Sequence, residues 1–276
     1  MILINGQPED RIDARDRGLQ YGDGLFETIA FRQNRLEFLD AHLARLQLGC
    51  ERLKLTVSSS DISLIKIELQ QSTSALQTDA VIKVMLTRGV GGRGYQYAEN
   101  TPITRIISSH PMPEYPPGFQ QGVDIRICEQ RLAINPQLAG IKHLNRLEQV
   151  LARNEWRDSR IAEGLMFDTD DHLIEGTMSN IMLFRQGELL TPDLHHSGIN
   201  GVMRSSLLQI ARQHDWPVYE SQLTLDDLLT ADECLLCNSV IGIWPVRQII
   251  GQDRQWPHGP MTQKLQQWLP QAIIHA

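Results

Sequence analysis

The strongest constraint on the fold of this chain is a proline-rich break near its middle. Residues 111–118, PMPEYPPG, hold four prolines within seven positions. Proline lacks a backbone N–H and fixes φ, so such a run cannot continue a helix or an interior strand. A chain of 276 residues is long enough for two domains. We therefore predict an N-terminal domain over 1–110, an interdomain linker over 111–120 and a C-terminal domain over 121–276.

Strand and helix patterns alternate in the first half of the chain, and short strands dominate beyond the linker. In the first half we predict strands at 1–4, 25–31, 80–87 and 103–108, a helix capped by Asp40 that ends near Leu53, and a second helix from about Ser60. Beyond the linker we predict strands at 123–127, 164–167, 173–175 and 180–184, a helix over 201–213, a helix capped by Thr224 and a C-terminal helix. The mixture predicts a fold class of α/β and α+β domains with a cleft between them.

The composition excludes several classes of partner. The net charge is −7, with 26 basic and 33 acidic residues and no basic run, which disfavours nucleic acid and anionic membrane as main partners. No segment has the unbroken apolar length of a transmembrane helix, and the first residues do not resemble a secretion signal. Four cysteines are too few for a disulfide framework in this length. We therefore expect a cytoplasmic protein.

The most informative motif is AGIKHLNRLEQ, residues 139–149, with a single lysine at its centre. Asn145 followed by Glu148 three residues later predicts a capping box at a helix start. Lys142 would then stand at the end of a rigid element, with its amine held in a defined direction. A partly desolvated lysine of this kind is nucleophilic near neutral pH and suits Schiff-base chemistry. The alternative is an ordinary solvated lysine.

A glutamate follows that lysine at a short apolar strand. Glu175 lies 33 positions after Lys142 (175 − 142), at the end of the predicted strand 173–175. A carboxylate there could pair with a protonated pyridine nitrogen and so make a pyridoxal ring an electron sink. The alternative is a solvated glutamate at a strand end.

Two further features could hold an anion. The small-residue turn SGINGVMR, 197–204, leads into a predicted helix, where free N–H groups and the helix dipole bind phosphate. The alternative is a plain helix-start turn. Arg45 lies on the leucine-bearing side of the first helix and either extends its charge to water or clamps an anion. The glycine-rich loop 89–95 lacks the ending of a nucleotide-phosphate loop, so we predict a flexible loop over an active site.

Two pairs of metal-ligand residue types are better explained without a metal. Cys234 and Cys237 have CxxC spacing, but their apolar surroundings and the lack of a second cysteine pair favour a buried strand. His195 and His196 stand in a predicted loop with no carboxylate at ligand spacing, which favours solvated side chains. We therefore predict no metal site.

The order of these motifs resembles that of fold-type IV pyridoxal-phosphate enzymes over nearly the whole chain. That group includes branched-chain aminotransferases, D-amino-acid aminotransferases and aminodeoxychorismate lyases. Four segments are most similar to the lyases: RGLQYGDGLFET (17–28), RGVGGRGY (88–95), GIKHLNRLEQVLAR (140–153) and CNSVIGIWPV (237–246). The resemblance implies a two-domain fold-type IV architecture.

The resemblance also implies a cofactor and a set of site residues. The cofactor would be pyridoxal 5′-phosphate, and the catalytic residues would be Lys142 and Glu175. Both would also bind the cofactor, together with Arg45, Ser179, Asn180, Gly198, Ile199, Asn200, Asn238 and Ser239. Arg105 and Arg93 would bind the carboxylates of a dianionic substrate.

The implied reaction is the conversion of 4-amino-4-deoxychorismate to 4-aminobenzoate, a folate precursor, and pyruvate. Lys142 would remove the proton at ring carbon 4, and aromatisation of the ring would supply much of the driving force. The resemblance further implies a homodimer. The alternative function is a branched-chain or D-amino-acid aminotransferase, which would use the same lysine and glutamate but leave the amino group on the cofactor.

Overall fold

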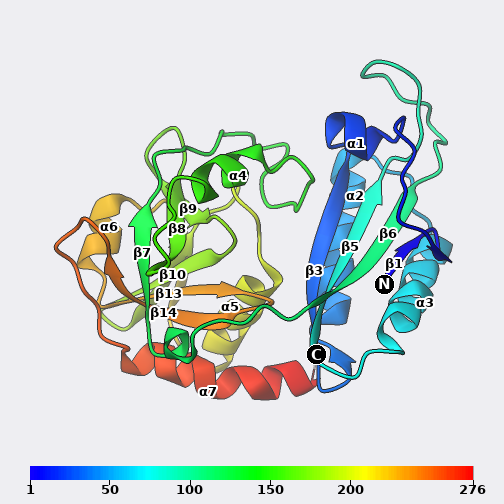
Figure 1. Ribbon diagram of the computed structural model, residues 1–276. Helices are drawn as coiled ribbons and strands as arrows, with labels where there is room; N and C mark the ends of the chain where they lie inside the picture. The colour runs from blue at the N-terminus through cyan, green and yellow to red at the C-terminus, as the bar shows by residue number, and fades with distance from the viewer. Residues whose placement is uncertain (276) are drawn as a thin grey trace. The chain divides into compact units, whose positions relative to one another are not determined.

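The computed structural model describes residues 1–275 and divides into two compact units (Figure 1). Unit 1 contains residues 1–113 and 141–145, and unit 2 contains residues 114–140 and 146–275. Lys142 thus belongs to unit 1, although it follows the proline-rich segment along the chain. The domain boundaries expected from the sequence stay a prediction.

Unit 1 is an antiparallel sheet with two main helices. Its strand order is β2-β1-β6-β5-β3-β4. The strands are β1 (Ile2–Ile4), β2 (Gln7–Pro8), β3 (Gly24–Arg32), β4 (Arg35–Leu36), β5 (Ala80–Thr87) and β6 (Thr104–Pro111), and the helices are α1 (Arg17–Tyr21), α2 (Leu39–Leu53) and α3 (Ser59–Thr73).

One face of this sheet is covered by both long helices. Leu25, Leu86 and Arg105 lie opposite one another on β3, β5 and β6, and so share a face. Leu25 packs under Gly49 of α2, and Arg105 pairs with Glu68 of α3. Phe26, one position along β3, therefore points to the opposite face.

Unit 2 is built on a mixed sheet with the order β12-β11-β10-β13-β14-β7-β8-β9. The strands are β7 (Val123–Ile127), β8 (Ile161–Phe167), β9 (Leu173–Gly176), β10 (Asn180–Arg185), β11 (Glu188–Pro192), β12 (Val218–Ser221), β13 (Glu233–Asn238) and β14 (Gly242–Ile249). The helices are the 3₁₀ turn η1 (Pro117–Gln120), α4 (Leu147–Arg153), α5 (Val202–Gln213), α6 (Leu225–Thr230) and α7 (Pro260–His275).

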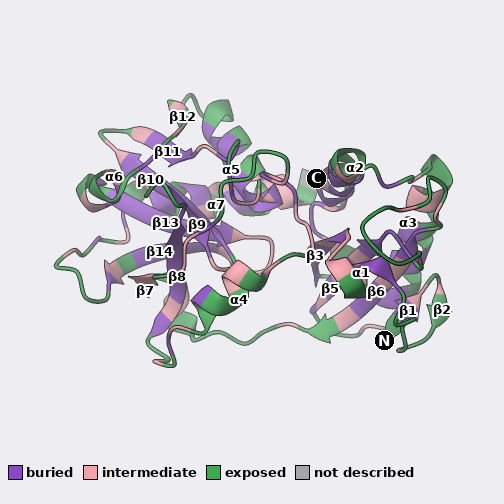
Figure 2. Cartoon of the chain, turned by 90° about the horizontal axis from the view of Figure 1, so that it is seen from above, coloured by how far each residue is buried: buried purple, intermediate pink, exposed green. Residues whose placement is uncertain are grey.

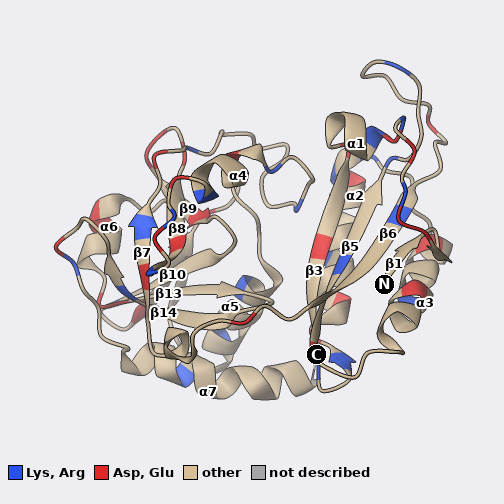
Figure 3. Cartoon of the chain, in the orientation of Figure 1, with Lys and Arg blue, Asp and Glu red and all other residues tan. Residues whose placement is uncertain are grey.

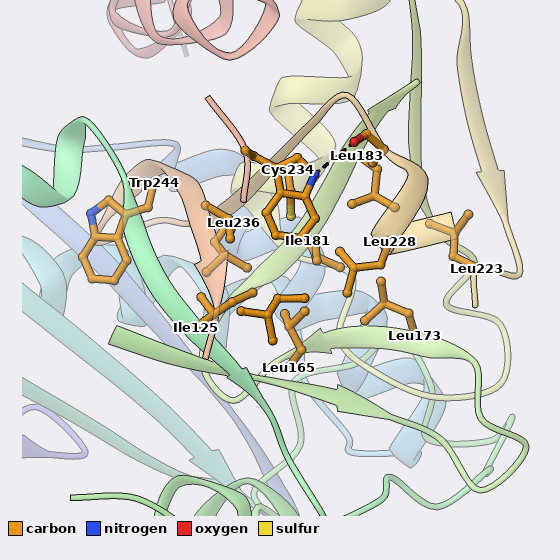
Figure 4. Packing of buried hydrophobic residues seen from close by; sticks show 14 of the residues in the cluster. Ile125, Leu165, Leu173, Ile181, Leu183, Leu223, Leu228, Cys234, Leu236 and Trp244 are labelled. Carbon is orange, nitrogen blue, oxygen red and sulfur yellow. Dashed lines mark hydrogen bonds between the residues drawn. The ribbon is translucent and has the colours of Figure 1, made fainter. Parts of the chain in front are cut away.

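The strands of unit 2 enclose its hydrophobic core. Apolar side chains from β7, β8, β9, β10, β13 and β14 converge there with Leu228 of α6 and Leu223, which precedes that helix. Figure 4 labels ten members of this cluster: Ile125, Leu165, Leu173, Ile181, Leu183, Leu223, Leu228, Cys234, Leu236 and Trp244. Cys234 and Cys237 lie on β13 and are free and buried, which confirms the predicted buried strand. Burial raises the pKa of both thiols, so neither is a reactive thiolate.

Several element predictions need correction. α2 begins at Leu39 after Phe38, which adopts a left-handed conformation, so Asp40 lies in the first turn and does not cap the helix. β6 extends to Pro111, which is tolerated because it is the last residue of the strand and pairs only with Ala80. β8 begins at residue 161, three residues before the predicted start.

The capping of α6 and the distribution of charge agree with the sequence. Thr224 and Asp227 form a capping box at the start of α6, as predicted. Basic and acidic residues are interspersed in both units (Figure 3). Within residues 1–275, no helix combines the length and apolarity needed to cross a membrane.

Candidate active site

The segment that carries Lys142 is an extended strand-like stretch beside β3. The Phe26 amide donates to the Lys142 carbonyl at 2.9 Å, and the Leu144 amide donates to the Gly24 carbonyl at 3.0 Å. A β-bridge joins Leu25 to residue 143 between these bonds. The lysine is therefore held by backbone pairing to a strand that lies far away in the sequence.

The predicted capping box at Asn145 and Glu148 is wrong. α4 starts at Leu147 with Arg146 at its N-cap, and no side chain caps it. Asn145 instead donates to the Gly22 carbonyl at 3.1 Å, and Glu148 accepts from the Ala133 amide at 2.9 Å. Asn145 and Glu148 therefore bond to residues outside the helix, and neither side chain is available to cap its start.

The Lys142 ammonium lies over an aromatic face. Its Nζ is 4.3 Å from the centroid of the Phe26 ring, close enough for a cation–π contact. Lys83 lies near the same ring, with its Nζ 5.4 Å from the centroid. Lys142 is half-buried. The alternative of an ordinary solvated lysine is thus disfavoured.

Glu27 of β3 is a buried carboxylate that joins two residues of α2. Arg45 donates to it from Nε at 2.8 Å and from Nη2 at 2.5 Å, and the His42 Nδ1 lies 2.6 Å from Oε2. Arg45 therefore binds an anion, which is one of the two alternatives that the sequence offered. The anion seen here is the Glu27 carboxylate of the protein itself. A role for Arg45 toward a cofactor phosphate stays a prediction.

The charges of this cluster follow from burial and pairing. Burial opposes ionisation of Glu27, but the Arg45 charge and the hydrogen bonds from His42 and Arg45 outweigh it and hold the Glu27 pKa at about 2. Burial lowers the pKa of His42, so the ring is neutral near pH 7. Its Nε2 is buried and has no hydrogen-bond partner among the described residues.

Arg105 lies where it is already neutralised. Its guanidinium donates to Glu68 at 2.7 and 3.0 Å and lies 3.8 Å from Asp61 of the same helix. It points to the face of the sheet that α2 and α3 cover, whereas Lys142 contacts Phe26 on the other face. This placement disfavours Arg105 as a ligand of a substrate carboxylate.

Arg93 belongs to an exposed loop in which the two following residues are bonded to α1. Arg17 donates to the carbonyls of Gly94 and Tyr95 at 2.9 and 3.1 Å, and Gly94 donates to the Tyr21 hydroxyl at 3.2 Å. The loop thus has fixed points on α1, while the Arg93 side chain is exposed. Its predicted role toward substrate stays a prediction.

In unit 2, Glu175 is only 3% exposed, so the alternative of a solvated strand-end glutamate is wrong. The Ile199 amide donates to its Oε2 at 2.8 Å, and the Gln149 amide group donates to its Oε1 at 3.4 Å. Burial lowers the pKa of Arg146, and the charges of Glu175 and Glu148 oppose that shift. Glu175 is therefore a buried carboxylate that accepts hydrogen bonds from the 198–200 turn and from Gln149 of α4.

The turn 198–200 is bonded to the same carboxylate and to the backbone of Gly140, all within unit 2. Gly198 has φ +81, and an added Cβ would lie 2.6 Å from Ile174, so glycine is required. The Ile199 carbonyl accepts from Asn180 at 2.8 Å, and the Asn200 amide donates to the Gly140 carbonyl at 3.0 Å. The Ile199 and Asn200 amides are thus already engaged, contrary to the expectation that they are free.

The start of α5 nevertheless suits an anion. Gly201 is its N-cap, and no side-chain hydrogen bond caps the helix. The Asn200 side chain accepts from Arg204 and Ser205 instead, each at 3.1 Å. Backbone amides and the dipole at such a helix start favour an anion, and the role of this turn toward a cofactor phosphate stays a prediction.

The remaining predicted residues surround the turn between β9 and β10. Ser179 donates to the Glu163 carboxylate at 2.8 Å. Asn238 donates to the Met178 carbonyl at 2.9 Å and accepts from two backbone amides, and Ser239 follows it in a half-buried turn. The structure thus brings Glu175, Ser179, Asn180 and Gly198–Asn200 into one hydrogen-bonded group within unit 2.

Sequence reasoning missed three buried polar residues of these groups: Glu27, His42 and Glu163. Each is buried, and the two glutamates stand alone in apolar strands, in GLFETIAF and IAEGLMF. A lone carboxylate in an otherwise apolar strand is a signal for a paired internal charge, because glutamate is almost never fully buried without partners.

Comparison with known proteins places this geometry in a family. Residues 24–249 match the amino-transferase class IV family. The chain belongs to this family. Among members of amino-transferase class IV, the aminodeoxychorismate lyase of Vibrio harveyi is 35% identical over 96% of this chain and 98% of its own. The solved 4-amino-4-deoxychorismate lyase of Pseudomonas aeruginosa is 46% identical, covers 98% of both chains and superposes with a TM-score of 0.93.

An aminotransferase is similar at lower identity. The D-alanine aminotransferase of Bacillus licheniformis is 28% identical over 99% of this chain and 97% of its own. Membership of amino-transferase class IV and the superposition confirm the predicted fold class.

Proposed function

We propose that this chain is a pyridoxal-phosphate-dependent lyase that converts 4-amino-4-deoxychorismate to 4-aminobenzoate and pyruvate. The observation that carries the proposal is the similarity to two lyases at 35% and 46% identity over nearly the full length. The residues fit the cofactor, because the chain offers an oriented lysine, a buried carboxylate and an uncapped helix N-terminus. When bound, pyridoxal phosphate supplies an electron sink for charge released at the substrate carbon.

Lys142 would hold the cofactor and would then move a proton of the substrate. Its backbone is fixed by pairing to β3, and its amine lies over the Phe26 ring. The free amine removes the proton from ring carbon 4 of the substrate. The bond between ring carbon 3 and the enolpyruvyl oxygen then breaks, the electron pair leaves with that oxygen, and the enolpyruvate takes up a proton to become pyruvate.

Glu175 would pair with the pyridine nitrogen of the bound cofactor, and its negative charge would favour the protonated ring. Its burial and its bond from the Ile199 amide fix the direction of the carboxylate. The turn 198–200, the start of α5 and Arg45 would hold the phosphate, and Ser179, Asn180, Asn238 and Ser239 would support the cofactor. Of the two arginines predicted for substrate, Arg93 is the better candidate, because Arg105 is neutralised by Glu68.

The second candidate function is transamination, which the similarity to a D-alanine aminotransferase supports. The two reactions share proton removal at the carbon that bears the amine and differ in whether the amino group stays on the cofactor. Incubation with D-alanine or a branched-chain amino acid distinguishes them. Rapid conversion of the cofactor to its pyridoxamine form would favour transamination.

We further propose that the enzyme is a cytoplasmic homodimer that serves folate synthesis. The family resemblance supports this assembly, and so does the surface of α4 (Figure 2). Three apolar side chains of that helix, Leu147, Val150 and Leu151, are 76%, 52% and 59% exposed, at positions that share one helix face. Such a stripe is suited to burial against a partner.

The test is a direct assay of both products. Purified protein is given 4-amino-4-deoxychorismate with and without added pyridoxal phosphate, and pyruvate and 4-aminobenzoate are measured. Equal amounts of both, dependent on the cofactor, are expected. Turnover of amino donors with no 4-aminobenzoate would contradict the proposed lyase.

A further inference from the structure

Glu163 is a buried carboxylate that the proposed mechanism does not use. It is 1% exposed and stands in β8 between apolar residues. It accepts five hydrogen bonds, all from neutral amides and hydroxyls. Burying a carboxylate is costly unless donors replace its water, so this arrangement persists only where the structure supplies them.

Four of the five donors come from the turn between β9 and β10. Thr177 donates from its amide at 3.1 Å and from its hydroxyl at 2.5 Å, the Met178 amide donates at 3.1 Å, and the Ser179 hydroxyl donates at 2.8 Å. The turn is also tight, because a Cβ on Gly176 would lie 2.3 Å from the Ser179 hydroxyl and 2.9 Å from the Glu163 carboxyl carbon. One side chain therefore accepts hydrogen bonds from all three residues of the turn, 177–179.

The two residues that flank this turn converge on Ile199. Glu175 precedes the turn and accepts from the Ile199 amide at 2.8 Å. Asn180 follows the turn and donates to the Ile199 carbonyl at 2.8 Å. The relative positions of the flanking residues, and through them the placement of Ile199, depend on the path of the chain between them.

We propose that Glu163 is a positioning residue of this site, which fixes the 177–179 turn and thereby directs Glu175 and the 198–200 turn toward the cofactor. The part of this inference that concerns the cofactor rests on the proposed function. The part that concerns the placement of Ile199 stands on the hydrogen bonds alone.

A matched control exists in the same unit. Glu233 is 5% exposed and accepts from the Met261 amide at 3.0 Å and from the Thr262 amide and hydroxyl, each at 2.8 Å. Glu233 is thus also a buried carboxylate bonded to neutral donors, which belong to the start of α7. It is the first residue of β13, whereas Asn238 is the last. Glu163→Gln and Glu233→Gln both exchange a carboxylate oxygen for an NH₂ group that faces donors.

The experiment compares these two variants with wild type, as full chains with and without pyridoxal phosphate. Tryptophan fluorescence during urea unfolding measures the stability of unit 2, and equilibrium dialysis measures cofactor affinity. Hydrogen exchange of peptides that contain Ile199 measures its protection, and steady-state kinetics give kcat and KM separately.

Similar losses of stability are expected in the two variants. In Glu163→Gln, but not in Glu233→Gln, the Ile199 amide hydrogen should exchange about tenfold faster than in wild type. The same variant should bind the cofactor at least about tenfold more weakly, and its kcat should change more than its KM. Thr177→Val removes one donor to Glu163 and should show the same changes in smaller measure, which keeps the test valid if Glu163→Gln does not fold.

Wild-type exchange at Ile199 and wild-type cofactor affinity in both Glu163→Gln and Thr177→Val would overturn the inference. The same losses in Glu233→Gln would also overturn it, because they would reflect general destabilisation. Glu175→Gln distinguishes a failure of the proposed function from a failure of the positioning role of Glu163. Normal turnover in that variant would contradict the proposed role of Glu175, while the exchange at Ile199 would still decide whether Glu163 positions the turn.

Discussion

The Glu27 cluster gives a prediction whose magnitude follows from the structure. Glu27→Gln keeps the shape of the side chain and removes its charge, so Arg45 loses its ionic partner and the neutral His42 ring loses a charged acceptor. The Glu27 pKa is held at about 2 against an ordinary value of 4.5. At about 1.4 kcal/mol per unit, this shift corresponds to roughly 3 kcal/mol at pH 7. Breaking a buried ion pair costs a similar amount, about 3–5 kcal/mol.

The direction of the pH dependence follows from the sign of the shift. A carboxyl whose pKa is lower in the folded state stabilises it above the unfolded pKa, and this stabilisation is lost as the pH falls through the folded pKa. The difference between wild type and Glu27→Gln should therefore be full at pH 7, shrink below about pH 4.5 and nearly vanish near pH 2.

The assay must resolve the two units. All five tryptophans lie in unit 2, at positions 156, 216, 244, 256 and 268, so fluorescence does not report on unit 1. Pulsed hydrogen exchange, measured on peptides from α2, monitors the unfolding of unit 1 in urea. With a slope of about 1.5 kcal/mol per molar urea, the midpoint of α2 should fall by roughly 2 M at pH 7, while the tryptophan signal serves as an internal reference.

Glu37→Gln is the matched control in unit 1. Glu37 is also buried and pairs with Arg32 at 2.7 Å, but burial raises its pKa. Its ionised form is therefore not favoured by folding, and its removal should leave the α2 midpoint at pH 7 nearly unchanged. A urea midpoint of α2 in Glu27→Gln within about 0.3 M of wild type at pH 7 would contradict a stabilising role of the Glu27 charge.

Four further predictions concern the site and the assembly. Lys142→Ala should lose the visible absorbance of lysine-bound cofactor and nearly all turnover, and an unchanged spectrum would remove Lys142 from the mechanism. Arg45→Lys keeps a charge near Glu27 but loses the paired N–H groups, and cofactor affinity should fall about one to two decades; wild-type retention through dialysis would contradict a phosphate contact. Glu175→Gln should keep the cofactor yet lower turnover at least about a hundredfold, with proton removal the affected step; full cofactor with a near-normal rate would exclude the pyridine pairing. Leu151→Glu should convert a dimer to monomer in light scattering, whereas Leu64→Glu on α3, also exposed, should not; an unchanged mass for Leu151→Glu would place the dimer interface elsewhere.

Several local elements follow from the amino-acid sequence alone. The alternation in β5 and β7 matched their observed bounds, and the Thr224 capping box and the end of α2 at Leu53 were predicted correctly. These features depend on residues within one turn or one strand, so the sequence contains all their partners. The motif order was also sufficient to indicate the family.

The contacts of the key side chains depend on the folded arrangement of the chain. Asn145 bonds to Gly22, more than a hundred residues earlier, and this contact replaces the local capping box that its sequence favoured. Arg105 is neutralised by Glu68 because strand register turns it toward α3, and register is not visible in a single strand. In the sequence Glu163 is a lone charge in an apolar strand, and its donors in the 177–179 turn lie close to it only in the folded chain. Local propensity acts over a few residues, whereas a buried charge takes its hydrogen-bond partners from wherever the fold brings them close.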